Sequence, residues 1–449
     1  MQPQPQASNF RWVICALLFF STTVNYMDRQ VISYLKEFFC TPAAAGGFGW
    51  SNTDFANLTS AFTAFYAGMT VLAGWVIDKI GTKLGLALSL IIWSVFGIAN
   101  AFVGSLTWMH MIVRSLFGIG EAGNFPASIK TVAEWFPKRE RALATGIFNS
   151  GANCGAMISA LFVPWCLIHF GDQQGWKMAF ILTGAAGFLW LIFWFRLYAP
   201  PGESKRLSRA EYDHIHVDDD AGLVENGGDK ARISWWKLFN YRQTWAFFWG
   251  KFLTDGVWWF YLFWLPDYLK KQFGMTRHEV MLPTFIVYGV AIIGSVYGGS
   301  IPMTLINKGM AVYKARMTAM FLIALCPLTV LSTQYFANVS HFGSWASPLA
   351  VAIICIGAAS HQAWSANLFT TVSDMFPKKS VGSVTGIGTM AGGLGGVIVQ
   401  KIAGALTDAF KETPQHAYLV LFIICALSYL TAWGVMKALV PRHRPIMDL

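Results

Sequence analysis

Long apolar runs follow one another along this chain, and short polar segments separate them. A transmembrane helix needs about 20 predominantly apolar residues, so runs of roughly 18 to 25 residues predict about twelve membrane-spanning helices. The helices are expected to start near Trp12, Thr53, Leu84, Trp108, Leu143, Trp176, Gln243, Val280, Ala315, Trp345, Val381 and His416. The pattern therefore predicts an all-α membrane protein.

The composition supports this interpretation and excludes other classes. Fifty-five per cent of the residues are hydrophobic and 12 per cent are charged, whereas a soluble domain carries about 25 per cent charged residues. The mean hydropathy is +0.46. The net charge of +10 is spread over loops without forming a patch, which argues against a nucleic-acid partner. Seven scattered cysteines show no metal-ligand spacing, so we expect no metal and no cofactor.

Basic residues gather at alternate ends of the predicted spans. One set of loops is rich in them, and it carries Lys79, Lys83, Lys138, Arg139, Arg141, Lys308, Lys314, Arg316, Lys378 and Lys379. The other set carries few, among them Lys36, Lys270 and Lys271. Because cytoplasmic loops are the positive ones, we expect both termini in the cytoplasm. The first span is too long and too polar for a cleavable signal.

The chain also contains an internal repeat. Phe136-Pro137-Lys138-Arg139 with Thr145-Gly146-Ile147 recurs 240 residues later as Phe376-Pro377-Lys378-Lys379 with Thr385-Gly386-Ile387. The same shift superposes Glu121 on His361 and Asn149 on Thr389. A hydrophilic segment separates the halves. We therefore expect twelve transmembrane helices in two pseudo-symmetric six-helix bundles facing a central cavity, residues 1–198 and 242–449, joined by a cytoplasmic linker, 199–241.

Small residues recur at four-residue spacing in spans five and eleven, as Gly151 and Gly155 and as Gly392 and Gly396. This spacing lets helices approach closely. Two interpretations remain open for these small residues. They serve tight static packing of helices, or they form a surface along which the two halves slide when they rock against each other.

Charged residues inside two spans point to function. Asp28 and Arg29 lie in the first span, and Arg114 and Glu121 lie two turns apart in the fourth. A charge near the membrane centre costs about 2.5 to 3.5 kcal/mol, so such residues usually face a cavity and mark a substrate or ion path. The two arginines suit a carboxylate, which guanidinium binds through two hydrogen bonds.

The acids Asp28 and Glu121 then become candidates for proton coupling. A buried carboxyl group is stabilised in its charged form by a nearby arginine, so its protonation depends on whether a substrate anion has taken that arginine as partner. The alternative is structural, with Asp28 paired to Arg29 and Arg114 paired to Glu121 to fix the packing of spans one and four.

The second half offers mostly neutral polar side chains. Span ten is polar in its middle, and span seven carries Trp258, Trp259 and Tyr261 too deep for an interfacial belt. Hydroxyl groups and the apolar face of a sugar ring would fit there, although for the aromatic run alone plain packing is the better explanation. The neutral candidates for substrate binding are Tyr66, Asn149, Trp258, His361, Gln362, Trp364, Asn367 and Thr389.

With these residues identified, the chain resembles the major facilitator superfamily. Gly74-Trp-Val-Ile-Asp78-Lys79-Ile-Gly81-Thr82-Lys83 is similar to that superfamily's loop motif. The resemblance implies that Gly74, Asp78, Lys79 and Gly81 control conformation by pairing with neighbouring helix ends.

A narrower resemblance covers nearly the whole chain. Asn25-Tyr26-Met27-Asp28-Arg29, the Arg114 to Glu121 segment and Trp135-Phe136-Pro137-Lys138-Arg139 resemble the anion:cation symporter family, and 252–266 with 361–370 resemble bacterial hexuronate transporters. The resemblance implies binding roles for Tyr26, Arg29 and Arg114, and proton coupling by Asp28 and Glu121. Galactonate carriers of that family have an Asn at about the position of Thr389, where this sequence departs.

The sequence thus predicts a proton-coupled symporter, a monomer in the bacterial inner membrane, that imports a sugar-acid anion such as glucuronate or galacturonate. An importer of another small carboxylate, such as an aldonate, tartrate or an aromatic acid, is the nearest alternative. A sensor that binds a sugar acid without moving it is a second alternative. An enzyme is not expected, since the sequence shows no nucleophile triad, metal cluster or phosphate loop.

Overall fold

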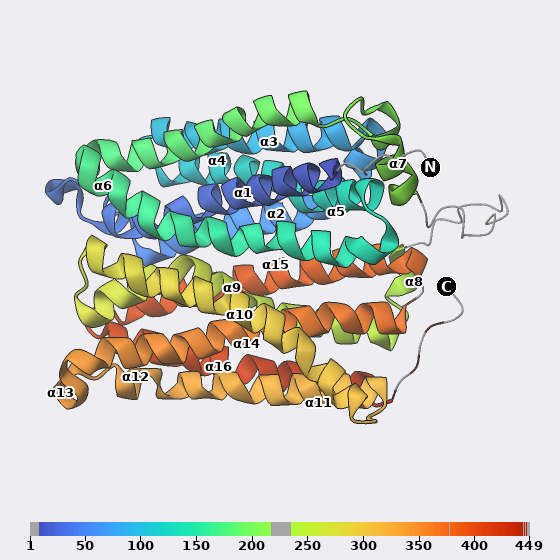
Figure 1. Ribbon diagram of the computed structural model, residues 1–449. Coiled ribbons are helices and arrows are strands. Elements are labelled where there is room, and N and C mark those ends of the chain that lie inside the picture. Colours follow the sequence, from blue (N-terminus) through green and yellow to red (C-terminus); the bar gives the residue numbers. More distant parts are fainter. Residues whose placement is uncertain (1–8, 217–234, 377, 443, 445, 447–449) are drawn as a thin grey trace.

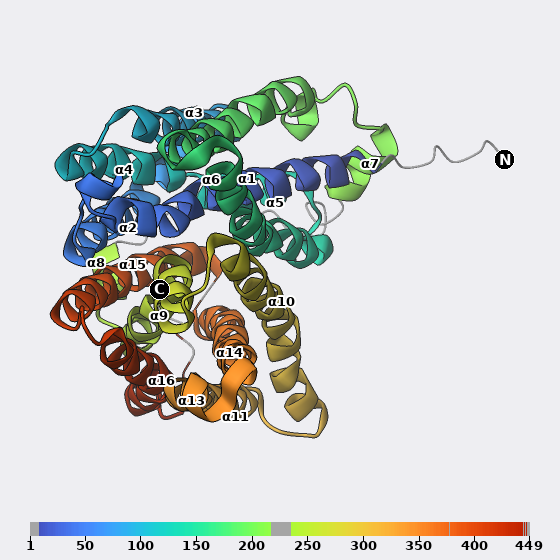
Figure 2. The same cartoon turned by 90° about the vertical axis from the view of Figure 1, so that its left-hand side faces the viewer.

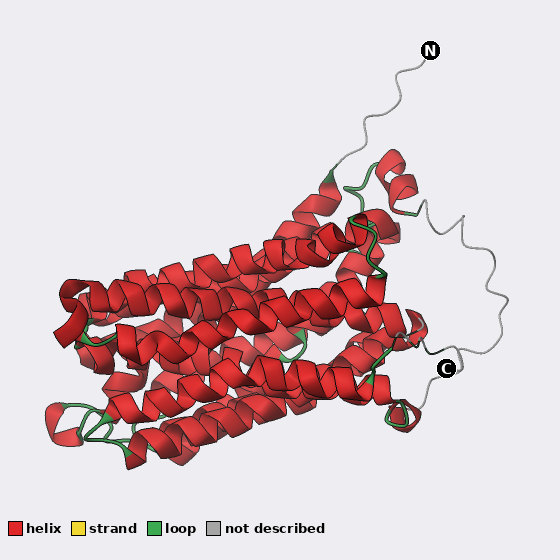
Figure 3. Ribbon diagram, turned by 90° about the horizontal axis from the view of Figure 1, so that it is seen from below, coloured by secondary structure: helices red, strands yellow, loops and turns green. Residues whose placement is uncertain are grey.

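The computed structural model describes residues 9–216, 235–376, 378–442, 444 and 446, without the side chains at 78, 138–139, 141–143, 235–236, 296, 299, 373–374 and 378–382. Throughout these ranges the regular structure is helical (Figure 3). Helices α1 to α7 form one group and α9 to α16 form the other, and both views show the groups side by side (Figures 1 and 2). We call them the N-bundle and the C-bundle.

The helices run nearly parallel to one long direction of the molecule (Figure 1). Those of the N-bundle are α1 Phe10–Cys40, α2 Asn52–Ile80, α3 Thr82–Ala99, α4 Thr107–Glu121, α5 Asn124–Trp135, α6 Lys138–Leu197 and α7 Arg209–Ile215. The rest are α8 Trp235–Leu238, α9 Arg242–Phe273, α10 Arg277–Asn307, α11 Val312–Leu325, α12 Thr333–Phe336, α13 Val339–Phe342, α14 Ala346–Met375, α15 Lys378–Ala409 and α16 Pro414–Leu439.

Helix α1 begins and α16 finishes at the same end of the molecule, which we call the terminal end; the opposite end is the far end (Figure 1). The predicted spans match these helices to within a few residues at most positions. Two details differ. Helix α6 contains two spans that meet at Gly171, where φ is 72° and the backbone is not helical. The fourth span is divided into α4 and α5.

Among the described residues, nine segments are long and apolar enough to cross a membrane by length and composition. Helix α6 contributes one of them although it turns back at Gly171. Helices α4 and α5 are each too short to qualify, and α9 is less apolar because it carries Lys251 and Asp255 among many Trp and Tyr side chains. The predicted fold class, an all-α transmembrane protein, is confirmed.

The two copies of the sequence repeat occupy equivalent places. Phe136 follows α5 in an extended conformation, and its N–H donates to the Val132 carbonyl at 3.0 Å. Phe376 follows α14 in the same conformation, and its N–H donates to Val372 at 3.0 Å. In both copies a long helix begins directly afterwards, so the repeat marks the same structural junction in each bundle.

The glycines of spans five and eleven serve close packing. A Cβ atom at Gly155 would lie 2.3 Å from the Thr23 carbonyl oxygen of α1. On α15, a Cβ atom at Gly392 would lie 2.2 Å from Asp255 and one at Gly396 would lie 2.5 Å from Trp259, both on α9. These contacts join helices of one bundle, which favours static packing over a gliding surface at these positions.

The predicted linker is not free along its whole length. Helix α7 lies within it and packs at the terminal end of the N-bundle, where Glu211 accepts hydrogen bonds from the N–H groups of Phe10 and Arg11. The Arg11 side chain bridges Glu211 and Glu140 at 3.0 and 2.8 Å. Burial acts to raise the pKa of Glu140, but hydrogen bonds with Arg11 and His214 outweigh it and hold that pKa below its usual range.

We expect Gly395→Ala to destabilise the C-bundle. A Cβ atom there would lie 1.9 Å from the Phe252 carbonyl oxygen of α9, so the two helices must separate. Overpacking of this kind costs about 1 to 3 kcal/mol, which thermal unfolding of the purified protein in detergent would report as a lower midpoint.

Gly434→Ala on α16 is the matched control. No atom lies within 4 Å of the position its Cβ would take, and alanine favours helix over glycine by about 1 kcal/mol. Equal midpoints for the two variants would contradict the packing described here.

Candidate functional site

Arg29 and Glu121 form a salt bridge in the interior of the N-bundle. Arg29 lies on α1, and Glu121 is the last residue of α4. The Arg29 Nε and Nη2 atoms each lie 2.9 Å from Glu121 Oε2. The two residues are only 2 % and 1 % exposed. Because an uncompensated buried charge is costly, this salt bridge fixes how α1 faces α4.

Aromatic rings surround the Arg29 guanidinium group. Its central carbon lies 4.4 Å from the ring centroid of Tyr26, 4.6 Å from that of Tyr66 and 5.4 Å from that of Phe62. A fourth ring, that of Trp259 on α9, lies at 5.3 Å and comes from the C-bundle. Cation–π contacts stabilise a desolvated cation by about 2 kcal/mol each at best. Arg29 is therefore held at the boundary between the bundles.

Arg114 lies beside Arg29. Its Nη2 atom donates to the Arg29 backbone carbonyl at 3.2 Å, and its guanidinium carbon lies 4.6 and 5.3 Å from the rings of Phe117 and Phe62. Its Nε and Nη1 atoms are buried and have no hydrogen-bond partner in the described part of the chain. An unmet buried donor costs about 1 to 3 kcal/mol. These unmet donors on a buried guanidinium group are available to the oxygen atoms of an anionic ligand.

Asp28 lies in a different environment from its neighbour Arg29. It is 2 % exposed, and neither of its carboxylate oxygens has a hydrogen-bond partner within the described residues. Its polar neighbours are Thr183 on α6 and Trp93 on α3. The second Glu121 oxygen, Oε1, is likewise buried without a partner. Two acids and one arginine therefore keep unused hydrogen-bonding atoms within one buried region.

The two ion pairs offered as the structural alternative are wrong. Asp28 and Arg29 are consecutive on a helix, so they point in different directions, toward α3 and toward α4. Arg114 and Glu121 share a face but are separated by two turns, about 10 Å along the axis, which is too far for a salt bridge. Glu121 reaches Arg29 on the neighbouring helix instead.

In the C-bundle, His361 and Trp258 form a stacked pair. Their ring centroids lie 5.0 Å apart with planes at 7°, and His361 Nδ1 lies 2.9 Å from the Tyr429 hydroxyl. His361 is 4 % exposed. It covers one face of Trp258, which leaves only the other face for a ligand.

Two further candidates of α14 serve packing. Asn367 donates its amide to the carbonyls of Gly298 and Ala363, each at 2.8 Å, and so fastens α14 to α10. Trp364 is fully buried and packs against Tyr429. The buried Trp364 Nε1 atom has no hydrogen-bond partner among the described residues.

The remaining candidates are more accessible. Asn149 is exposed, and Tyr26, Tyr66, Gln362 and Thr389 are half-buried. Tyr26 and Tyr66 contact Arg29 directly. Of these candidates, the contacts of the structure bring Tyr26 and Tyr66 to the buried charges.

The loop motif between α2 and α3 is only partly explained by the structure. Gly81 adopts a φ of 84°, a conformation that suits glycine, and Gly74 lies in α2 beside α5. The Lys79 Nζ atom lies 3.9 Å from the ring centroid of Trp75 on the same helix, not at a neighbouring helix end. The Asp78 side chain lies outside the described residues.

A neighbouring cluster was missed by sequence reasoning. Glu134 of α5 accepts hydrogen bonds from Thr82 and Tyr198, both at 2.8 Å, and so ties the start of α3 to the last turn of α6. The internal repeat could have pointed to this cluster, because the 240-residue shift places the acidic residue Glu134 at the same position as a second acid, Asp374. This cluster holds the terminal end of the N-bundle together.

The far end carries a buried salt bridge between the bundles. Lys36 of α1 lies 2.5 Å from Asp267 of α9, and the two side chains are 1 % and 7 % exposed. Tyr418 donates to the same carboxylate, and Lys271 lies 3.2 Å from it. Sequence reasoning placed Lys36 outside the membrane because the first apolar run stops near Leu35, but α1 continues to Cys40.

Further contacts close the same end. Asp408 of α15 accepts hydrogen bonds from the N–H groups of Asn52 and Thr53, at 3.0 and 2.6 Å, in the first turn of α2. A carboxylate at a helix N-terminus is favourable for the helix dipole. Closer to the middle of the molecule, the Gln400 side-chain amide donates a hydrogen bond to the Thr63 hydroxyl group at 2.9 Å. These contacts hold α2 against α15 over the far half of their length.

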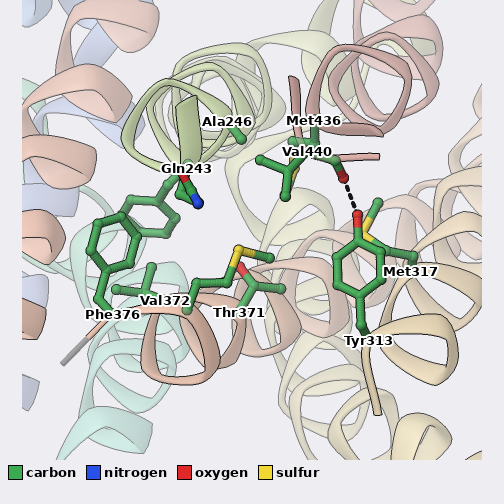
Figure 4. A pocket seen from close by; sticks show the side chains of 11 residues that line it. Gln243, Ala246, Tyr313, Met317, Thr371, Val372, Phe376, Met436 and Val440 are labelled. Carbon is green, nitrogen blue, oxygen red and sulfur yellow. Dashed lines mark hydrogen bonds between the residues drawn. The ribbon is translucent and has the colours of Figure 1, made fainter. Parts of the chain in front are cut away.

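A separate pocket lies toward the terminal end of the C-bundle (Figure 4). It is lined by Gln243, Ala246, Phe247, Tyr313, Met317, Thr371, Val372, Met375, Phe376, Met436 and Val440. None of these is a candidate site residue, and none carries a charge that would bind an anion. The Tyr313 hydroxyl donates to the Val440 carbonyl across it. We therefore do not place the functional site there.

Comparison with known proteins gives three findings. Residues 18–400 match the family model of the Major Facilitator Superfamily. The chain is 28 % identical over 429 residues to the hexuronate transporter of Escherichia coli K12, covering 95 % of this chain and 94 % of that protein. It is 27 % identical over 435 residues to the D-galactonate transporter of Escherichia coli O6:H1, covering 95 % and 96 %.

A solved structure has the same fold. It is a bacterial homologue of the human lysosomal transporter Spinster in an inward-facing, occupied conformation, with a TM-score of 0.73 and 16 % identity over 99 % of this chain and 100 % of that one.

We expect Asp267→Asn to lower the thermal midpoint of the protein, because it leaves the Lys36 ammonium buried without a carboxylate. Removing one member of a buried pair costs about 3 to 5 kcal/mol. In the double variant K36M/D267N we expect the midpoint to fall by less than the sum of the falls in Lys36→Met and Asp267→Asn alone, because no buried charge is left without a partner.

Lys411→Met serves as the control. Lys411 is 63 % exposed and lies 3.9 Å from Asp408, so its loss changes stability by less than about 1 kcal/mol. Strict additivity of the two single variants in the double variant would contradict a coupled pair at the far end.

Proposed function

The chain belongs to the major facilitator superfamily of membrane transporters, and from this premise we propose that it imports a sugar-acid anion together with protons. Hexuronates such as glucuronate and galacturonate are the proposed substrates. Relatives named for hexuronate and D-galactonate transport match nearly its whole length. The buried cations in the middle of the molecule suit the carboxylate that these substrates share.

One observation carries the proposal: Arg114 keeps two buried donors that have no partner among the described residues, beside the Arg29 guanidinium group. A substrate carboxylate there would accept a hydrogen bond from Arg114 and compete with Glu121 for Arg29. Tyr26, Tyr66 and Asn149 of the N-bundle, with Trp258, Gln362 and Thr389 of the C-bundle, are proposed to contact the rest of the sugar. His361 positions Trp258 by stacking on it.

Proton coupling follows from the same competition. When the substrate carboxylate takes Arg29, Glu121 loses its salt bridge in a buried region, and a buried carboxylate without a cation binds a proton readily. Asp28, which has no salt bridge in this conformation, is the second proposed proton site. Return of Glu121 to Arg29 would release substrate and proton together.

We propose alternating access between the two bundles, residues 1–198 and 242–449 joined by 199–241. Contacts such as Lys36 to Asp267 and Asp408 to the start of α2 lie at the far end, which supports a conformation closed on that side. With the terminal end in the cytoplasm of a bacterium, this is an inward-facing state in the inner membrane. Gly74, Asp78, Lys79 and Gly81 would act at the inner side when it closes.

In proteoliposomes with an inward proton gradient, we expect the wild-type protein to accumulate radiolabelled glucuronate or galacturonate. Glu121→Gln should lose accumulation driven by the gradient yet still exchange internal for external substrate, since it cannot take up the proton. Binding without time-dependent uptake by the wild type would identify a sensor. Full accumulation by Glu121→Gln would exclude Glu121 from coupling.

Arg29→Lys should raise the KM for the sugar acid by at least about tenfold, because an ammonium group lacks the planar donor pair that fits a carboxylate. Arg196→Lys, an exposed position in the last turn of α6, is the control and should leave KM unchanged. An unaltered KM in Arg29→Lys would remove Arg29 from substrate recognition.

A further inference from the structure

A second ion pair lies in the middle of the C-bundle, within a single helix. Lys251 Nζ lies 2.6 Å from Asp255 Oδ2, one turn apart on α9. The Lys251 ammonium group also lies 4.6 Å from the ring centroid of Phe369 on α14. Intramembrane charges are rare and usually mark a substrate path, and the transport mechanism described above does not use these two.

Asp255 is the more accessible member of the pair. The Lys251 side chain is 7 % exposed and that of Asp255 is 17 % exposed. The Asp255 Oδ2 atom, which binds Lys251, also lies against α15, where Gly392 leaves the room it needs.

The pair also lies close to the Arg29 site. Trp259 lies one turn beyond Asp255 on α9 and so on the same face of that helix, and its ring centroid lies 5.3 Å from the Arg29 guanidinium carbon. The two side chains also pack side by side against α15, at Gly392 and Gly396. A six-carbon ligand held at Arg29 therefore has its other end near Asp255.

We infer that the Lys251–Asp255 pair selects the charge of the ligand's other end, and so favours sugar acids with one carboxylate over aldaric acids with two. This inference rests on the proposed function. The pair is neutral as a whole, and its accessible carboxylate accepts hydrogen bonds from hydroxyl groups. A second ligand carboxylate at the same place meets a like charge, while the ammonium that could bind it is already paired.

The two members should therefore have unequal effects on selectivity. Asp255→Asn keeps the size of the side chain and frees the Lys251 ammonium for a second carboxylate. Lys251→Gln leaves the buried Asp255 carboxyl group without a cation, so this group binds a proton readily and no longer repels a second carboxylate, but no ammonium is freed to bind one. A pair that served packing alone would lower uptake of all substrates together and leave their ratio unchanged.

The test is competition in proteoliposomes. Unlabelled glucarate and galactarate, and unlabelled galacturonate, compete with radiolabelled glucuronate for uptake by each variant. We expect the potency of the aldarates relative to galacturonate to rise about tenfold in Asp255→Asn, equivalent to about 1.4 kcal/mol, and to rise less in Lys251→Gln. Asp255→Glu should keep the wild-type ratio, and the double variant K251Q/D255N should show only the smaller rise of Lys251→Gln.

The outcomes separate the two proposals. An unchanged ratio in both single variants overturns this inference while the transport of sugar acids stands. Failure of the wild type to take up any uronate overturns the proposed function itself. If Asp255→Asn does not fold, Lys251→Gln still decides, since an unchanged or lower ratio there contradicts the inference.

Discussion

The salt bridge between Arg29 and Glu121 is the interaction on which the rest of the structure depends. A guanidinium group at this depth must have a carboxylate partner or lie among rings that accept its charge, and the protein supplies both. Because Arg29 is on α1 and Glu121 ends α4, the pair also sets the packing of the N-bundle. In the proposed mechanism a substrate carboxylate replaces Glu121 as the partner of Arg29, and this exchange couples substrate binding to proton binding.

The same arginine connects the two bundles. Trp259 of α9 contacts Arg29, so a change in the charge around Arg29 alters the strength of a contact between the two bundles. At the far end, Lys36 and Asp267 join the same two helices, again with the cation on α1 and its partner on α9. The cation–π contact of Arg29 and the salt bridge of Lys36 therefore both involve α1 and α9, and a movement of these two helices relative to one another would change both contacts.

The sequence predicted the helices well because apolar length is a direct requirement of the bilayer. It predicted the buried charges for the same reason, since each is conspicuous in an apolar run. It could not predict their partners. Asp28 and Arg29 are adjacent in sequence yet face different helices, and Lys36 lies just beyond an apolar run but within α1. Pairing depends on how helices rotate against their neighbours, and periodicity within one helix does not contain that information.

The most direct test of the exchange at Arg29 is to measure protons during binding. Galacturonate is added to purified protein in weakly buffered detergent solution containing a pH indicator. The account predicts that the protein takes up protons from the medium as the anion binds, because Glu121 is displaced from Arg29, and that Glu121→Gln takes up fewer. Binding of the anion with no proton uptake by the wild-type protein would contradict it.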